Sequence, residues 1–222
     1  MSKIKGNIIE KGGVNISTVG GVFNEQMRES IPGAKEDPNY KATGISVVLH
    51  PLSPKIPSMH FNTRFLKTSQ EWFGGGMDIT PSLKFNNEEN YHNGLEKICN
   101  RYDKSYYAKY KKWCDDYFFL KHRNEARGIG GIFFDYLQTG DWGKDFEFVQ
   151  EIGLYFQNFV KTTLLALKDE EWSNDEKQIQ LSKRSRYAEF NLLYDRGTKF
   201  GLETGGNIDA ILMSMPPLAK WD

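Results

Sequence analysis

Residues 59–65, Met59-His60-Phe61-Asn62-Thr63-Arg64-Phe65, decide the fold because their side chains alternate along the chain. His60, Asn62 and Arg64 fall on one side of an extended segment, whereas Met59, Phe61 and Phe65 fall on the other. Successive side chains of a β-strand point to opposite faces of its sheet, so this pattern predicts a strand with one polar face and one buried face.

Further strands are predicted on both sides of this segment. Residues 44–50 form a β-branched run closed by Pro51, and residues 72–81 read as a strand interrupted by three glycines. Similar patterns predict strands over 128–137, 187–195 and 210–215. Residues 20–43 are polar and contain several glycines and prolines, which predicts a loop with one short strand.

Two long helices are expected between these strands. Apolar residues recur at spacings of three and four over 88–122 and over 145–168. The charged residues 169–177 are expected to form a linker. Because the helices separate groups of strands rather than following every strand, the sequence predicts an α+β fold with an antiparallel sheet that is open to a ligand on one side.

The composition favours a folded protein of a reducing compartment. The chain has 222 residues, with 29 Lys and Arg against 29 Asp and Glu. This balance argues against a general nucleic-acid-binding protein. The two cysteines, Cys99 and Cys114, match no zinc pattern. We find no signal peptide and no stretch of about 18 apolar residues, so we expect a soluble cytoplasmic protein without a membrane span.

Several common catalytic motifs are absent from the sequence, namely the P-loop, GxGxxG, GxSxG and HExxH. The predicted polar face is therefore the strongest chemical signal. His60 can exchange a proton near neutral pH, and Arg64 can bind a carboxylate through two hydrogen bonds. Ser46 and His50 share a face of the neighbouring predicted strand. The alternative interpretation is a solvated sheet face, and glycines 74–76 by themselves indicate only a bulge or a close backbone approach.

The four histidines, His50, His60, His92 and His122, raise the question of a metal site. His92 and His122 lie near opposite ends of the predicted helix over 88–122, roughly 45 Å apart at the α-helical rise per residue. The sequence therefore favours His60 as an acid–base residue and the other three as structural groups.

Two further polar groups lie near the C-terminus. Asp195 and Arg196 end a predicted strand in which Asp195 shares a face with Glu189, and they are candidates for an ion pair or a ligand clamp. Residues 204–207, Thr204-Gly205-Gly206-Asn207, form a predicted turn whose backbone amides can meet an anion. Ordinary turn chemistry is the alternative for both groups.

Six segments of the chain, taken together, resemble the oxygen-dependent coproporphyrinogen III oxidase family and occur in order along essentially the whole chain. They are EKGGVNIS (10–17), HP followed by two more prolines (50–57), MHFNTR (59–64), WFGGGMDITP (72–81), RGIGGIFFD (127–135) and RYAEFNLLYDRGT (186–198) continuing to Pro217.

The resemblance implies a large, seven-stranded antiparallel sheet with helices on both faces, in one domain of residues 1–222 that assembles as a homodimer. The implied reaction is oxidative decarboxylation of two propionates of coproporphyrinogen III to vinyl groups, which gives protoporphyrinogen IX with molecular oxygen as acceptor. The family is described as needing no organic cofactor, and some bacterial members are described with a divalent metal bound by histidines.

The resemblance also implies roles for residues of this chain. His60 matches the proposed proton donor, and Asp78, Asp195 and Arg196 match charged groups of the catalytic site. The substrate-binding positions that match are Ser46, Asn62, Arg64, Gly205, Gly206 and Asn207. The positions that match metal ligands are His50, His60, His92 and His122. Residues 187–222, from Tyr187 to Asp222, match the dimerisation region. We expect a single cleft to be lined by His60, Asn62, Arg64, Asp78, Asp195 and Arg196.

The chain departs from the family pattern at three places. The turn usually ends in arginine where this chain has Asn207, and Ser185 stands where many members have glycine. We also expect the chain to be shortened at both ends relative to the family. These departures favour a second interpretation, a porphyrinogen-binding protein that has lost turnover, and the histidines favour a third, a histidine–metal oxidoreductase.

Overall fold

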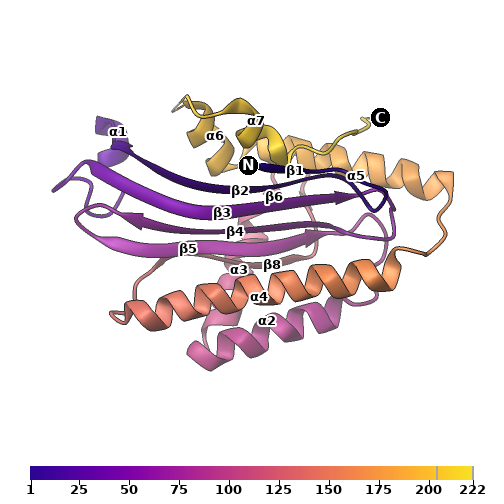
Figure 1. The fold of residues 1–222 in the computed structure, drawn as a ribbon, viewed down its shortest axis with the longest axis horizontal. Coiled ribbons are helices and arrows are strands. Elements are labelled where there is room, and N and C mark those ends of the chain that lie inside the picture. The colour runs from indigo at the N-terminus through magenta and orange to yellow at the C-terminus, as the bar shows by residue number, and fades with distance from the viewer. Residues whose placement is uncertain (204, 222) are drawn as a thin grey trace.

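The structure, a computed structural model, describes residues 1–203 and 205–221 (Figure 1). Within that part of the chain, six strands form one antiparallel sheet in the order β1-β2-β3-β4-β5-β8. These strands are β1 (Ser2–Ile4), β2 (Ile9–Val22), β3 (Asn39–Pro51), β4 (Ser58–Lys67), β5 (Glu71–Thr80) and β8 (Gly130–Leu137). The α+β class and the antiparallel sheet are confirmed, but the count of seven strands is not.

The remaining elements are mostly helices that follow β5. They are α1 (Glu25–Arg28), α2 (Glu88–Tyr102), α3 (Tyr106–Tyr117), α4 (Trp142–Leu167), α5 (Asn174–Leu193), α6 (Arg196–Glu203), α7 (Ile208–Ile211) and the 3-10 turn η1 (Leu212–Ser214). A short ribbon of β6 (Phe119–Leu120) and β7 (Glu125–Ala126) follows α3. No helix in the described residues is long and apolar enough to cross a membrane.

The strand predicted over residues 59–65 lies within β4, and its register defines the two faces of the sheet. His60 lies opposite Val48 of β3 and Asp78 of β5, and Asn62 lies opposite Ser46 of β3. Paired residues of antiparallel strands project to the same side of a sheet. These side chains therefore share one surface, which we call the site face.

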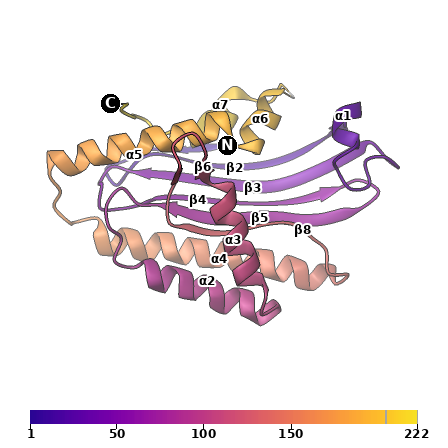
Figure 2. The ribbon, with the colours of Figure 1, turned by 180° about the vertical axis from the view of Figure 1, so that it is seen from behind.

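The opposite surface, the core face, carries the apolar half of the alternation. Met59 and Phe61 of β4 and Met77 of β5 are buried there. The ring of Phe61 stacks on Phe156 of α4, with 5.1 Å between ring centroids. Figures 1 and 2 show α4 and α2 running alongside each other at this side of the sheet. Burial of this apolar surface, at roughly 25 cal/mol per Å², holds β4 and β5 in the register that builds the site face.

The prediction of one helix over residues 88–122 is wrong, because this stretch contains the two helices α2 and α3. It breaks at Asp103, whose backbone is extended and whose carboxylate accepts hydrogen bonds from the amide and hydroxyl of Ser105. A side chain that bonds the backbone two residues ahead competes with helical hydrogen bonding. α3 then starts a new direction, and His122 lies beyond its end, in the turn between β6 and β7.

The C-terminal part of the chain differs most from its prediction. The strands predicted over 187–195 and 210–215 are helical, and α5 begins inside the stretch predicted as a charged linker. A capping box between Ser173 and Glu176 starts α5. Tyr187, Phe190 and Asn191 are buried at spacings of three and four, so the helical period overrides the short alternation.

Residues 20–43 contain more strand than predicted. β2 continues to Val22 and β3 begins at Asn39, where these two residues pair. Both sides of this part of β2 are exposed to solvent, so no apolar alternation marks it in the sequence. The paired strands β2 and β3 therefore extend past the position of Ser46 on the site face.

Candidate active site on the site face

His60 and Asp78 form the centre of the site face. The Nδ1 atom of His60 lies 2.7 Å from Oδ1 of Asp78, and Nδ2 of Asn62 lies 3.3 Å from Nε2 of His60. With a neutral imidazole, Nδ1–H donates to the carboxylate and Nε2 accepts from the amide. The side chain of His60 is 18% exposed and that of Asp78 is 4% exposed, so the histidine faces solvent and the carboxylate stands behind it.

Behind Asp78 lies Arg127, which precedes β8 and donates from Nη2 to Oδ2 of Asp78. Burial raises the pKa of Asp78, but the charge of Arg127 and the contact with His60 outweigh burial and hold that pKa below its ordinary value. Asp78 is therefore an anion at neutral pH. Arg127 was not predicted as a site residue, although it stands directly before the Gly128-Ile129-Gly130-Gly131 run.

Arg64 extends the polar row along β4. Its Nη2 atom lies 2.6 Å from Oδ2 of Asp135 of β8, and its side chain is 33% exposed. A Cβ atom on Gly74, between them on β5, would lie 2.6 Å from Oδ1 of Asp135 and 2.9 Å from Cζ of Arg64. The first glycine of the 74–76 run is therefore needed for this ion pair to form across the strand. Ser46, which is half-buried, lies opposite Asn62 on β3.

The prediction that Asp195 and Arg196 end a strand is wrong, because these residues stand at the start of α6. Asp195 caps this helix, because its Oδ2 atom accepts from the amide of Thr198 at 2.7 Å and from its hydroxyl at 2.8 Å. The hydroxyl of Tyr117 donates to Oδ1 of Asp195 at 2.9 Å. Asp195 therefore shares no strand face with Glu189, and its carboxylate oxygens are engaged in positioning α6.

Arg196 nevertheless lies on the site face. Its guanidinium carbon is 5.2 Å from the ring centroid of Tyr117 and 5.8 Å from that of Phe133. Phe133 lies opposite Gly76 of β5, which lies opposite Asn62 of β4. The structure thus brings Arg196 to the same side of the sheet as His60, Asn62 and Arg64.

The turn between α6 and α7 holds the last predicted substrate-binding residues. Gly205 has φ +69°, a backbone conformation that favours glycine, and the amide of Gly206 donates to the carbonyl of Gly201 at 2.9 Å. Asn207 caps α7 by accepting from the amide of Ala210 at 3.1 Å. These three residues are exposed, and Thr204, the first residue of the predicted turn, lies outside the described residues.

The four histidines do not form the metal site that the resemblance implies. His50 is buried between Ser58 and the carbonyl of Ser214, and burial lowers its pKa to about 3. His92 contacts the carbonyl of Ile129 and the hydroxyl of Tyr107, and His122 contacts Tyr194 and Glu189. Across residues 1–203 and 205–221, no three His, Cys, Asp or Glu side chains are grouped to hold a metal. The donor set therefore does not fit one ion.

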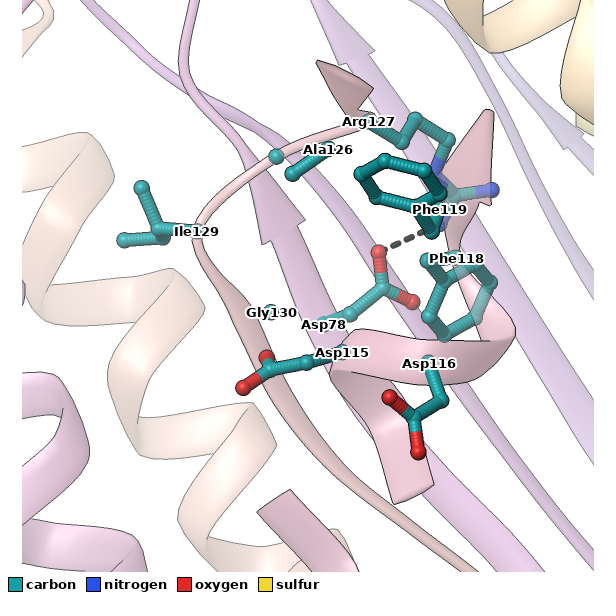
Figure 3. A pocket seen from close by; sticks show the side chains of 10 residues that line it. Asp78, Asp115, Asp116, Phe118, Phe119, Ala126, Arg127, Ile129 and Gly130 are labelled. Carbon is teal, nitrogen blue, oxygen red and sulfur yellow. Dashed lines mark hydrogen bonds and ion pairs between the residues drawn. The ribbon is translucent and has the colours of Figure 1, made fainter. Parts of the chain in front are cut away.

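A cavity of about 320 Å³ lies beside the Asp78–Arg127 pair (Figure 3). Its other walls come from the end of α3, where Asp115 and Asp116 lie, and from residues 126–130, which run from the end of β7 to the start of β8. Figure 3 shows the ion pair of Asp78 and Arg127 at one side of this cavity and the two α3 carboxylates at another. No cavity was predicted here from the sequence.

Comparison with known proteins gives consistent matches over the whole chain. Residues 2–222 match the family model described as coproporphyrinogen III oxidase. The chain is 52% identical over 223 residues to the oxygen-dependent coproporphyrinogen-III oxidase of Rickettsia akari (strain Hartford). It is also 52% identical to the proteins of that name from Rickettsia bellii (strain OSU 85-389) and Rickettsia rickettsii (strain Sheila Smith). Each alignment covers 100% of this chain and 80% of the relative.

Proposed function

The chain belongs to the coproporphyrinogen III oxidase family, and we propose that its site face carries out oxidative decarboxylation of coproporphyrinogen III to protoporphyrinogen IX, with O₂ as electron acceptor. At each of two propionates the carboxylate leaves as CO₂ and a hydrogen leaves the carbon next to the ring with its electron pair. O₂ takes up that hydrogen and electron pair together with a proton from solvent and becomes H₂O₂. The match over residues 2–222 is the observation that carries the proposal.

The geometry supports specific roles on the site face. Arg64 is one-third exposed and can turn from Asp135 to a substrate carboxylate, with which it forms charge-assisted hydrogen bonds. Asn62 and, opposite it on β3, Ser46 add neutral hydrogen-bonding groups next to Arg64. The proposed role of His60 is to exchange a proton with the porphyrinogen, and its contact with the Asp78 anion supports this role. Arg196 adds a positive charge above Phe133, which suits a substrate that carries several carboxylates.

The C-terminal part of the chain supplies the remaining proposals. Gly205, Gly206 and Asn207 would approach a propionate through their turn, and Asp195 would act by holding α6 over the site face.

We also propose that residues 187–222 form a homodimer contact, of which Asp222 lies outside the described residues. One domain over 1–222, a sheet of about seven strands with helices on both faces, and a cytoplasmic location without an organic cofactor remain predictions.

A second candidate function is porphyrinogen binding without turnover. The observation that favours it is Asn207, which stands where the family usually has arginine and whose side chain caps α7. A substrate held without this arginine would bind in a less defined position, and turnover depends strongly on position.

The test is aerobic turnover of coproporphyrinogen III by the purified chain, followed by the fluorescence of oxidised product. We expect protoporphyrin to accumulate in air and not under nitrogen, with CO₂ released in proportion. Binding of coproporphyrinogen without any product in air would establish the second candidate instead. Turnover that is abolished by a chelator and restored by one divalent ion would show that a metal takes part despite the separated histidines.

A further inference from the structure

The side chain of Arg127 is almost completely buried behind the site face. Its side chain is 1% exposed, and its ion-pair partner Asp78 is 4% exposed. The guanidinium carbon lies 4.0 Å from the ring centroid of Phe118, 4.3 Å from that of Tyr187 and 4.8 Å from that of Phe190. Three rings around one guanidinium fix its plane through cation–π contacts.

Asp78 links Arg127 directly to His60. Asp78 divides its two carboxylate oxygens, because Oδ2 accepts from Arg127 and Oδ1 accepts from His60. Phe118 forms a second connection, since its ring contacts the guanidinium and also lies edge-on to the imidazole of His60 at 6.2 Å between centroids. The orientation of the imidazole is therefore set from two directions by groups that Arg127 holds.

We propose that Arg127 is a positioning residue for the reaction: it fixes the rotation of the Asp78 carboxylate, which in turn holds His60 in the tautomer and orientation that present Nε2 to the substrate. The inference rests on the proposed function in one respect, namely that His60 exchanges a proton with the porphyrinogen. The orientation itself is a property of the folded protein without substrate.

The other groups around Asp78 do not replace this role. The titratable side chains that interact with it from neighbouring elements, besides His60 and Arg127, are Tyr91 of α2, Cys114 of α3 and Tyr187 of α5. Burial raises the pKa of each of these three groups, so none carries a charge at neutral pH. Arg127 is the only permanent cation in hydrogen-bond contact with Asp78 among the described residues.

Arg184 provides a matched control. It is also a buried arginine with a carboxylate partner, since Nη1 lies 2.9 Å from Oε2 of Glu10 and Nη2 donates to the carbonyl of Pro51. Neither Glu10 nor Pro51 is a hydrogen-bond partner of His60 or Asp78. Loss of Arg184 removes a buried ion pair of the same kind without touching His60.

The experiment compares Arg127→Lys, Arg127→Met and Arg184→Met in steady-state turnover of coproporphyrinogen III. We expect kcat to fall about 100-fold in Arg127→Met, the lower range for general acid–base catalysis, with KM changed less than about threefold. Arg127→Lys keeps the charge without the planar fork and should lose about tenfold in kcat. Arg184→Met should keep kcat within about twofold of the parent chain after correction for folded fraction.

A second measurement needs no turnover. ¹⁵N NMR of the histidine side chains should show His60 protonated at Nδ1 in the parent chain and in Arg184→Met, and a mixture of tautomers in Arg127→Lys. The inference is overturned if the His60 signals are unchanged in Arg127→Lys, if kcat stays at the parent value, or if KM rises while kcat is kept. If Arg127→Met does not fold, Arg127→Lys decides. An inactive parent chain with the expected NMR result would refute the proposed function but not the positioning.

Discussion

The strands β3 to β5 and the helices α6 and α7 both hold predicted site residues, but they hold them in different ways. On β4 and β5, register places His60 against Asp78, and both side chains make their contacts with other groups of the site face. In the helices, Asp195 and Asn207 use their side chains as N-caps, so their first contacts are with the backbone of their own helices. A residue on a strand is thus positioned by the sheet, whereas a residue at a helix start positions the helix.

The largest effect on stability is expected from removing the charge of Asp78, which the register of β4 and β5 buries beside His60. Asp78→Ala leaves Arg127 buried without its anion, and we expect the free energy of unfolding to fall by about 3–5 kcal/mol. Chemical denaturation of the two chains measures this. Asp209→Ala removes an exposed ion pair between α7 and Lys3 and serves as the control, with an expected loss of less than about 0.5 kcal/mol. If Asp78→Ala and Asp209→Ala lost equal free energy of unfolding, the ion pair of the strand region would be no more important for stability than the exposed pair of the helical region.

Arg64→Ala should separate binding from stability on the same strand. Arg64 is partly exposed, so its removal should weaken coproporphyrinogen binding by about 1.5–3 kcal/mol, seen as a rise in KM of roughly 10- to 150-fold. Asp135 loses its partner, and we expect about 1 kcal/mol of lost stability. Steady-state kinetics and thermal denaturation of the same preparation give both quantities. A large fall in thermal midpoint with an unchanged KM would assign Arg64 to the fold rather than to the substrate.

Much of the strand region could be predicted because polar and apolar residues alternate along a half-buried strand, so the sequence shows which residues belong to each face. The alternation at residues 59–65 gave the strand, the polar face and the candidates His60, Asn62 and Arg64, and the structure places all three on one surface. The partners of these residues could not be predicted in the same way. Arg127 is 49 residues from Asp78 in the chain, and only the folded sheet brings the two together.

The C-terminal region could not be predicted because its helices are short or carry a mixed pattern. Over residues 187–195 the alternation of period two and the helical spacing of Tyr187, Phe190 and Asn191 coexist, and tertiary burial decides between them. The error over residues 88–122 has a local cause, because the carboxylate of Asp103 ends one helix and opens the next. The separation assumed for His92 and His122 along one helix therefore has no basis, although the structure does not group the histidines at one site.

Glu189 of α5 offers a test of the helical region by pH. Hydrogen bonds from Arg123 lower the pKa of Glu189; burial opposes them, and His122 and Trp221 add to the lowering, so that the pKa is about 2 against an ordinary value of 4.5. A depressed folded-state pKa stabilises the fold above the unfolded value and loses that stabilisation as pH falls from 4.5 through about 2. Partial exposure of the partners reduces the effect to about 1–2 kcal/mol.

Glu189→Gln removes this titration. Denaturant unfolding at several pH values should show the parent chain losing about 1–2 kcal/mol more than Glu189→Gln between pH 5 and pH 2. At neutral pH the variant should be the less stable of the two, since glutamine cannot pair with Arg123 or His122 as an anion. Parallel curves for the two chains across this range would mean that the cluster contributes nothing that depends on charge.

The smallest effect, and the one that bears most directly on the helical region, is expected from Asn207→Arg. Arginine cannot accept the hydrogen bond from the amide of Ala210, so α7 loses its cap and the protein about 1 kcal/mol of stability. The same change introduces a guanidinium at the turn where the resemblance to the family implies one, and a new contact with a propionate should lower KM for coproporphyrinogen by up to about tenfold. Asn207→Ala loses the same cap without adding the charge, so it isolates the two contributions: both variants should lose similar stability, and only Asn207→Arg should gain affinity. If the two variants have the same KM, the turn does not reach the substrate, and Gly205, Gly206 and Asn207 serve only to join α6 to α7.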